Sequence, residues 1–351
     1  MFRTRQAPSP TGYLHIGTAR TVLFTKLFAM INDGKWYLRL EDTDRNRLQS
    51  EAVKTLLNAL GQIGLQADEG ISLRSLEKKI VILSKQEVEA GLVHSEPSTR
   101  QAKDPLAIEN KTTNESNQPD DFYGIYQQGE FGPYIQSQRL TIYQYHAQNL
   151  IDQNIAYWSY LTPEDKQELQ EIKQITKRPI NYSRVCKDKF SEQDLKQKVT
   201  EALQDERKPV LMYRLQRDER VICKDELLGS SEFDLNLEED FGILKSDGYP
   251  TYHLAHLIDD HLMETTMVIR SQEWFPSFPK HQTMFLDYWK VAPQYCHLPF
   301  ILGENGNKKM SKRDGNVNMQ DYLDKGYLPE AIINYLAFLG WNPGTEKEMY
   351  L

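Results

Sequence analysis

Residues 2–20 of this 351-residue chain read FRTRQAPSPTGYLHIGTAR, and this stretch decides the fold. Residues 2–7 predict a short strand. The segment that follows must be a loop, because two prolines within three residues forbid regular backbone pairing. From Thr18 to Ile31 the apolar side chains recur every four residues, which predicts a helix. A strand, a glycine-containing loop and a helix in this order are typical of the start of a parallel α/β sheet.

The next residues continue this pattern and then leave it. Residues 36–40 predict a second strand, and Ser50 is expected to cap a helix that runs through Gln62. The segment 71–131 breaks the pattern, because residues 95–121 are rich in Ser, Glu, Pro, Asn and Asp and predict a solvated excursion.

The rest of the chain divides by similar signals. Apolar runs at Phe241–Leu244 and Met267–Arg270 predict that the parallel sheet resumes, and the sequence beyond Asp314 is helical. We therefore expect the first half of a Rossmann-type sheet at residues 1–70, an atypical and partly flexible insertion at 71–131, a helix of the same domain at 132–154, a smaller inserted domain at 155–240, the second half of the sheet at 241–304 and a loop followed by helices at 305–351.

The composition excludes several classes of protein. The chain is 39% hydrophobic and 26% charged, and it has neither an apolar run that could span a bilayer nor an N-terminal signal segment. We therefore expect a cytoplasmic protein that contacts no membrane. Three widely spaced cysteines, Cys186, Cys223 and Cys296, argue against a disulfide framework or a thiolate zinc site. The net charge of −8 does not by itself predict nucleic-acid binding.

The loop before the first helix carries residues suited to phosphate binding. It places His15 and Gly17 at the carboxyl end of the first strand, where open α/β sheets bind ligands. A helix N-terminus attracts phosphate through its free N–H groups, Gly17 allows close approach, and His15 can donate a hydrogen bond. The alternative is that His15 only caps the helix, and the three-residue match His15-Ile16-Gly17 taken alone favours that alternative.

A second loop carries several cations. Residues 308–313 read KKMSKR and follow a turn rich in Gly and Asn at 303–307. Such a loop can close over a triphosphate, where Lys309 and Lys312 would neutralise the charge that develops as pyrophosphate leaves. Most charge runs are only solvated surface, so the functional interpretation depends on the presence of both motifs in this order.

Together the two motifs resemble the signatures of class I aminoacyl-tRNA synthetases, in which H-I-G follows the first strand and K-M-S-K lies near the end of the catalytic domain. The sequence between them is similar to the glutamyl branch, the glutamyl-tRNA synthetases. The segments that carry this similarity are Ala7–Arg20, Leu40–Arg45, Gly132–Tyr134 with Gln136-Ser137, Ser246–Tyr252, Asp259–His261 and Leu328–Ala331. The resemblance omits residues 71–131 and is weaker in 165–235.

The resemblance implies a fold and a set of substrate contacts. The fold is a Rossmann-type parallel α/β sheet with an inserted α+β domain that binds the tRNA acceptor end, and a C-terminal helical region that contacts the tRNA stem. Arg5 would pair with the side-chain carboxylate of glutamate, a bidentate task that suits arginine. The glutamate set comprises Arg5, Ala7, Ser9, Glu41, Tyr252, His256 and Arg270, with Glu41 accepting from the α-ammonium. The ATP set comprises His15, Gly17, Glu273, Trp274, Ile301, Lys309 and Lys312, of which His15, Lys309 and Lys312 would be catalytic.

Simpler roles exist for several of these residues. Arg5 could be a surface cation, Tyr252 a core residue, and Arg270 the ion-pair partner of Glu273. Glu41 lies in an acidic turn that could be solvated or hold a metal. Residues 253–261 contain His and Asp at metal-ligand spacing, but a strand end that lines the active site accounts for them better, and no metal site is expected.

The chain departs from the family's pattern in several places. His256 stands where relatives often have a small amide, and a protonated imidazole there would favour glutamate over glutamine. Ser159 and Leu161 lie near the positions where some relatives have zinc-binding cysteines, so no zinc is expected. The usual anticodon-binding region is absent, so we expect the catalytic part of a longer enzyme.

The expected activity is a two-step reaction of a monomeric enzyme. The glutamate carboxylate attacks the α-phosphorus of ATP, with Mg²⁺ on the phosphates, and gives glutamyl-adenylate and pyrophosphate. The resemblance implies that the 2′-OH at the 3′ end of tRNA-Glu then takes the glutamyl group, and that activation needs bound tRNA.

Three alternatives stay open. A glutamyl-queuosine tRNA-Asp synthetase also lacks the anticodon region, although the intact 309–313 loop and the helices after Asp314 argue against it. Glutaminyl specificity is disfavoured by the segment Ala7–Gly12. A catalytically silent paralogue that only binds tRNA or a partner should have lost His15 or the lysine loop, and both are present.

Overall fold

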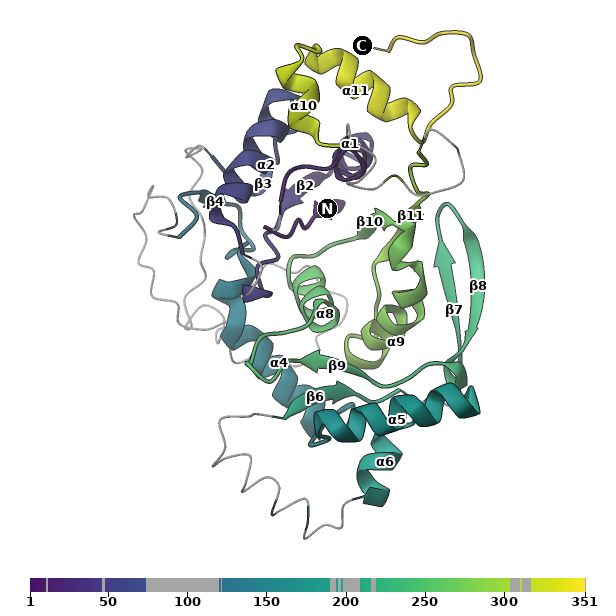
Figure 1. Cartoon of the computed structure of the whole chain (residues 1–351). Coiled ribbons are helices and arrows are strands. Elements are labelled where there is room, and N and C mark those ends of the chain that lie inside the picture. The colour runs from purple at the N-terminus through teal and green to yellow at the C-terminus, as the bar shows by residue number, and fades with distance from the viewer. Residues whose placement is uncertain are drawn as a thin grey trace.

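The computed structural model describes residues 1–10, 12–45, 48–73, 120, 122–189, 194, 197, 209–215, 219–303, 310 and 317–350. These residues form an eight-stranded sheet in the order β4-β3-β2-β1-β10-β11-β7-β8 and a three-stranded sheet in the order β5-β6-β9 (Figure 1). None of the helices in these ranges is both long and apolar enough to cross a bilayer.

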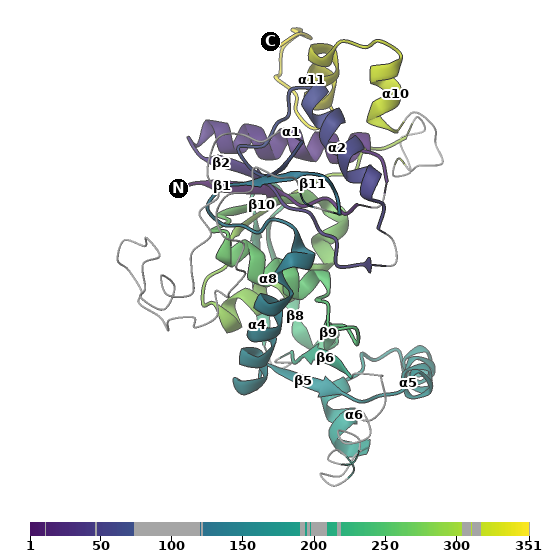
Figure 2. The same cartoon turned by 90° about the vertical axis from the view of Figure 1, so that its left-hand side faces the viewer.

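Four parallel strands form the centre of the large sheet. They are β1 (Arg3–Gln6), β2 (Lys35–Leu38), β10 (Met267–Ser271) and β11 (Gln294–Leu298). Figure 2 shows α1 (Ile16–Ile31) on one face of the sheet and α8 (Tyr252–Leu262) on the other. Helices on both faces explain why these short strands are almost wholly buried.

One edge of the large sheet is formed by β3 (Glu69–Ser72), parallel to β2, and β4 (Tyr126–Gln128), antiparallel to β3. The two ends of the 71–131 segment therefore lie side by side, whereas residues 74–119, to which the predicted flexibility mainly refers, lie outside the described ranges. Gly70 in β3 has a φ of 102° and lies so close to Leu38 that a Cβ would overlap the Leu38 carbonyl oxygen.

The opposite edge is a hairpin of β7 (Arg220–Asp225) and β8 (Gly229–Asp234). It joins the large sheet through parallel pairing of β7 with β11, where Tyr295 is opposite Asp225. The expectation that all of residues 155–240 belong to a separate inserted domain is therefore wrong for this hairpin. Its alternating polar and apolar residues were compatible with either sheet, and only the pairing with β11 decides between them.

The small antiparallel sheet consists of β5 (Ala156–Ser159), β6 (Val210–Tyr213) and β9 (Phe241–Leu244). It packs against α4 (Leu140–Asp152) and α8 through a buried cluster that includes Tyr143, Leu211, Ile243 and Leu254. The prediction that Phe241–Leu244 resumes the parallel sheet is wrong, because β9 pairs with β6 instead. Helices α5 (Pro163–Thr176) and α6 (Tyr182–Lys189) lie beyond this sheet, at the bottom of Figure 2.

The remaining elements complete the two faces. These are α2 (Ser50–Gln62), the 3-10 turns at Gln136–Arg139, Leu235–Leu237 and Gln272–Ser277, α9 (Phe278–Tyr288), α10 (Met319–Asp324) and α11 (Pro329–Phe338). Figure 2 shows α11 above α1, at the end of the molecule opposite the small sheet.

The structure corrects two local predictions made from the sequence. Gln49 rather than Ser50 is the N-cap of α2, and residues 253–261 lie on helix α8 rather than at a strand end.

Candidate active site

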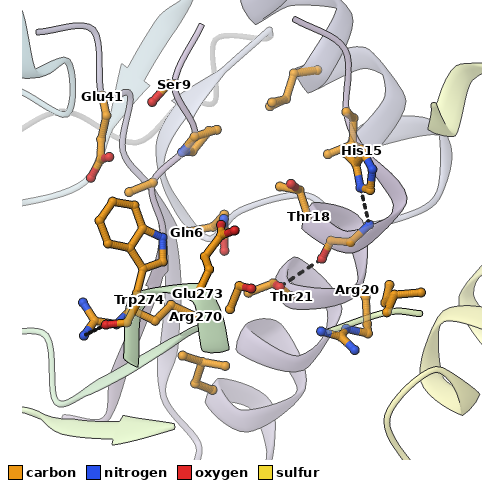
Figure 3. Close-up of a pocket in the computed structure, with 18 of the residues that line it drawn as sticks. Gln6, Ser9, His15, Thr18, Arg20, Thr21, Glu41, Arg270, Glu273 and Trp274 are labelled. Atoms are coloured by element: carbon orange, nitrogen blue, oxygen red, sulfur yellow. Dashed lines mark hydrogen bonds between the residues drawn. The ribbon is translucent and has the colours of Figure 1, made fainter. Parts of the chain in front are cut away.

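A cavity of about 660 Å³ opens at the carboxyl ends of β1 and β10, beside the N-terminus of α1 (Figure 3). This volume is typical of sites for small molecules, and the position is the ligand-binding edge of an open α/β sheet. Eleven residues predicted from the sequence line it, namely Arg5, Ala7, Ser9, His15, Gly17, Glu41, Tyr252, Arg270, Glu273, Trp274 and Ile301. Lys309 and Lys312 lie outside the described ranges.

The N-terminus of α1 forms one end of the cavity. His15 is the N-cap, and its Nδ1 accepts a hydrogen bond of 3.0 Å from the Gly17 amide, the contact dashed in Figure 3. Because Nδ1 accepts, the proton of the neutral ring lies on Nε2. The capping role and the predicted role as a hydrogen-bond donor to phosphate are therefore compatible, since they use different ring nitrogens.

Arg5, at the end of β1, is buried against Asp260 of α8. Its Nε lies 3.1 Å from both oxygens of Asp260, and its Nη2 lies 3.0 Å from Oδ2. Arg39 donates to the same carboxylate at 2.7 Å. Although burial opposes ionisation, these two guanidinium groups hold the pKa of Asp260 well below its ordinary value. Arg5 is thus a fixed buried cation rather than a surface residue, and it shares its charge with a carboxylate of the protein.

Glu41 lies after β2, at the opposite end of the same ionic network. Its carboxylate pairs with Arg39 at 3.5 Å, and its side chain is 13% exposed. Burial raises the pKa of Glu41 from 4.5 to about 7, against the opposing effect of Arg39 and Arg5. Glu41 is therefore a mostly buried carboxylate rather than a freely solvated one. The described residues contain no group of three or more possible metal ligands.

Arg270, at the end of β10, is buried among neutral acceptors. Its Nε donates to Nε2 of His297 at 2.9 Å, and its Nη1 lies 2.9 Å from Nδ1 of His281. Nη1 also donates to the hydroxyl of Tyr252 at 3.3 Å. Within the described ranges no salt bridge joins Arg270 to Glu273, so the simpler role suggested for Arg270 by the sequence is not found.

Two aromatic side chains form a wall of the cavity. The rings of Tyr252 and Trp274 lie 4.3 Å apart between centroids, and Tyr252 is held at its hydroxyl by Arg270. Tyr252 is therefore a lining residue rather than a core residue. Ile301 also lines the cavity, near Gly17, and its carbonyl accepts the Met310 amide at 2.8 Å.

His256 is the one described residue of the predicted glutamate set that does not line the cavity. It is fully buried behind Tyr252, whose ring lies parallel to it at 5.5 Å. Its Nδ1 faces Asp260 and its Nε2 faces the hydroxyl of Tyr295 at 3.0 Å. Burial lowers the pKa of His256 to about 3, so the ring is neutral. The structure thus places His256 outside the cavity lining and gives no support to a positive charge there that selects glutamate, while a contact of His256 with the substrate stays a prediction.

The structure also reveals supporting residues that the sequence did not identify. Asp260, which also accepts from Arg39, fixes Arg5, while His281 and His297 contact Arg270. Asp260 lies within the segment Asp259–His261 that carried the family resemblance, which was the available signal. The two histidines carried no such signal, because each stands alone in its segment.

Comparison with known proteins places this geometry in a family. Residues 1–90 and 108–351 match the sequence profile of the class I tRNA synthetases (E and Q), catalytic domain. The chain belongs to this family. Its fold is the class I catalytic fold, a mostly parallel sheet with a small antiparallel insert, as predicted from the sequence.

Individual relatives within this class I family point to its glutamate branch. The chain is 35% identical over 348 residues to the glutamate–tRNA ligase of Clostridioides difficile and 36% identical over 349 residues to that of Borreliella burgdorferi. It is similar, with a TM-score of 0.75 and 30% identity, to the crystal structure of a glutamate tRNA ligase from Elizabethkingia meningosepticum in complex with its amino acid. These matches cover 99% of this chain but only 60%, 59% and 62% of those proteins, so the chain corresponds to the catalytic part of such ligases.

Proposed function

We propose that this chain activates L-glutamate with ATP and transfers it to the 3′ end of tRNA-Glu, as the catalytic part of a glutamate–tRNA ligase that works as a monomer. One observation carries the proposal. The cavity brings two buried arginines suited to carboxylates, Arg5 and Arg270, together with a helix N-terminus suited to phosphates. An amino acid with two carboxylates and a nucleotide can therefore meet in one place.

In the first step a carboxylate oxygen of glutamate forms a bond with the α-phosphorus of ATP, and the bond from that phosphorus to pyrophosphate breaks. The N-terminus of α1, with His15 and Gly17, binds the phosphates, while Trp274 and Ile301 bind the base and Glu273 the ribose. Lys309 and Lys312 neutralise the leaving pyrophosphate. Catalysis then consists mainly of positioning and charge stabilisation.

Mg²⁺ would neutralise charge on the phosphates. The described lining offers the carboxylates Glu41 and Glu273, and Glu41 is already paired with Arg39. This lining fits an ion held mainly by the phosphates and water, which is the usual coordination of Mg²⁺ at nucleotide sites.

Glutamate is the amino acid that the charges of the site favour. Arg5 and Arg270 lie on the lining while their other faces are enclosed by protein. Glutamine would leave one of these donors without an anionic partner, a mismatch that can lower kcat/KM on the order of 10⁴-fold. We expect aspartate, which is one methylene shorter, to be a poorer substrate than glutamate.

The decisive experiment is pyrophosphate exchange with glutamate, glutamine or aspartate, with and without tRNA-Glu. We expect exchange with glutamate only, and only when tRNA-Glu is present. Exchange with glutamine but not glutamate would contradict the substrate, and no exchange with any amino acid would indicate the silent paralogue. Transfer to tRNA-Asp instead of tRNA-Glu would support the queuosine alternative.

A Lys312→Ala variant should lose most of the rate of pyrophosphate exchange.

The small antiparallel sheet and its helices would hold the acceptor end of the tRNA. Lys173, Lys177 and Arg178 line a groove of about 440 Å³ at the end of α5, and such basic grooves bind nucleic-acid phosphates in a salt-dependent way. A Lys177→Glu, Arg178→Glu double variant should weaken tRNA binding at least tenfold, as measured by filter binding at two salt concentrations. The matched control is Lys290→Glu, an exposed lysine after α9, which should leave tRNA affinity unchanged.

A further inference from the structure

Arg270 differs from three other buried arginines, Arg5, Arg39 and Arg139, in what it pairs with. Arg20, which also lines the cavity, donates to the backbone carbonyls of Leu339 and Pro299. Arg5, Arg39 and Arg139 each contact a carboxylate, at distances of 2.7–3.0 Å. Arg270 instead donates to two imidazole rings and a tyrosine hydroxyl, and its Nη2 lies 3.4 Å from the carbonyl oxygen of Trp274. Within the described ranges no carboxylate lies at salt-bridge distance from it.

The hydrogen bonds define the state of both rings. An arginine only donates, so the ring nitrogen that faces it must carry a lone pair. In His297 the other nitrogen, Nδ1, faces the buried Asp225 carboxylate at 2.7 Å and therefore carries the proton. In His281 the other nitrogen, Nε2, faces Nδ1 of His253 at 2.9 Å. Each ring is thus a neutral tautomer with one nitrogen committed to Arg270.

The environment favours these neutral forms. His281 and His297 are 1% and 0% exposed. Burial, together with the charge of Arg270, lowers the pKa of His297 to about 4 and that of His281 well below its ordinary value. A charged imidazole beside Arg270 would also repel it.

The charges of the surrounding network balance without Arg270. Arg5, Arg39 and Arg139 contribute three positive charges, and Asp259, Asp260 and an ionised Glu41 contribute three negative charges in direct contact with them. Glu273 also lines the cavity, but it is exposed and makes no salt bridge to Arg270 within the described ranges. The buried carboxylate of Asp225 is separated from Arg270 by the ring of His297. Among these four arginines, Arg270 is therefore the one that no carboxylate of the described residues contacts directly.

We propose that His281 and His297 are positioning residues, which fix the guanidinium of Arg270 as neutral hydrogen-bond acceptors and so leave it without a direct carboxylate partner until the substrate binds. This proposal rests on the proposed function in one respect, that the anionic substrate is glutamate. A carboxylate at either position would hold the arginine equally well but would cancel its charge. An imidazole satisfies the donor and adds no charge.

Two variants at one position separate hydrogen bonding from charge. His281→Asn offers a neutral acceptor near the place of Nδ1, whereas His281→Asp offers a charged acceptor of the same size. We expect His281→Asn to keep KM for glutamate within about threefold and His281→Asp to raise it more than about 100-fold, with KM for ATP unchanged in both. His281→Leu, which has no acceptor, should raise KM for glutamate about 10- to 100-fold.

The control is His146→Leu. His146 is equally buried, but it bonds to Tyr288 and packs on Trp289, neither of which lines the cavity. This variant should lower thermal stability and leave KM for glutamate unchanged. Equal KM values for His281→Asn and His281→Asp, in proteins shown to be folded by thermal denaturation, would overturn the proposal.

A second measurement needs no substrate. In protein labelled with ¹⁵N-histidine, the ring nitrogen shifts of His281 and His297 should show neutral tautomers at pH 7, with the protons on Nε2 and Nδ1 respectively. An imidazolium at either position would overturn the proposal, whichever amino acid the enzyme activates. If the enzyme proves to use another anionic amino acid, the proposed function fails. The variants His281→Asn and His281→Asp then test the positioning of Arg270 with that amino acid.

Discussion

Glu41 is the carboxyl group of the cavity whose charge changes near neutral pH. Its pKa of about 7 exceeds the ordinary 4.5, so the folded protein binds more protons than the unfolded chain between these values. The contribution of Glu41 to stability is therefore fully present below pH 4.5 and is lost as the pH rises through about 7. Binding of an ammonium group has the opposite dependence, because it needs the ionised form.

This opposition gives a prediction for glutamate binding. We expect KM for glutamate to rise by up to about tenfold per pH unit as the pH falls below 7. A Glu41→Gln variant should have a higher KM at pH 8 and no such dependence between pH 6 and 8. Initial rates of pyrophosphate exchange over this range measure both. A wild-type KM that does not vary with pH would contradict the assignment of Glu41 to the ammonium group.

His256 gives a second prediction at the scale of one residue. Since its ring is neutral and lies behind Tyr252, a change to Asn should affect stability rather than selectivity. Asn cannot reach both Asp260 and Tyr295, so we expect a loss of about 1–3 kcal/mol in the free energy of unfolding. The ratio of kcat/KM for glutamate to that for glutamine should stay within a few-fold. A tenfold or larger fall in that ratio would show that His256 contacts the substrate.

Among the elements, β3 depends on a single glycine. Gly70 combines a positive φ with a close approach to the Leu38 carbonyl, so Gly70→Ala adds both backbone strain and a steric clash. We expect a loss of about 3 kcal/mol or more in the free energy of unfolding, measured by urea denaturation. Gly64→Ala is the matched control. Gly64 also has a positive φ, 75°, but open space around it, so about 1 kcal/mol is expected. Equal losses in the two variants would contradict the role of the clash.

The elements also show what the sequence could predict. The strand β1 and the helices α1 and α2 were predictable because their apolar spacing is local, and α1 differs only in beginning at Ile16, since His15 caps it. The partner of β9 was not predictable from the sequence. A strand of four mostly apolar residues can belong to a parallel or an antiparallel sheet, and its composition does not distinguish the two. Its position depends on β6, which lies about 30 residues earlier.

For the site, the sequence predicted which residues take part, but it did not predict where each side chain points or what it contacts. Eleven residues identified by motif do line one cavity. His256 lies on the same helix as Tyr252, yet one turn of helix places it behind the cavity wall. The pairing of Arg5 with Asp260 spans 255 residues of sequence, and no local signal reports a contact at that distance.

At the scale of the whole molecule, a buried ionic network connects parts that are far apart in sequence. Asp260 of α8 binds Arg5 of β1 and Arg39 after β2, and its neighbour Asp259 binds Arg139 before α4. Burial opposes the ionisation of Asp260, but Arg5 and Arg39 lower its pKa well below 3.8. The network therefore stabilises the fold above that value and loses this contribution as the pH falls towards the lowered pKa.

We expect Asp260→Asn to lower the free energy of unfolding by about 3–5 kcal/mol at pH 7, because it leaves the buried Arg5 without a carboxylate partner and Arg39 with only its longer contacts to Asp259 and Glu41. The difference from the wild type should shrink below pH 3.8. Asp287→Asn is the control, since Asp287 pairs with no arginine of the described residues and the amide oxygen of Asn can still accept the hydrogen bond from Tyr213. It should cost less than about 1 kcal/mol at pH 7. Urea unfolding at pH 7 and pH 3.5 measures both variants, and similar losses would contradict the network.

The pairing of β1 with β10 has a consequence for how the protein is made. A ribosome delivers β1 first, and the strand that covers one of its edges follows 263 residues later. Until then that edge presents unpaired backbone groups, which readily recruit strands from other chains. The long separation also makes this pairing slow to form. The centre of the sheet should therefore close late in synthesis, and nascent chains released before residue 271 should aggregate unless a chaperone shields β1.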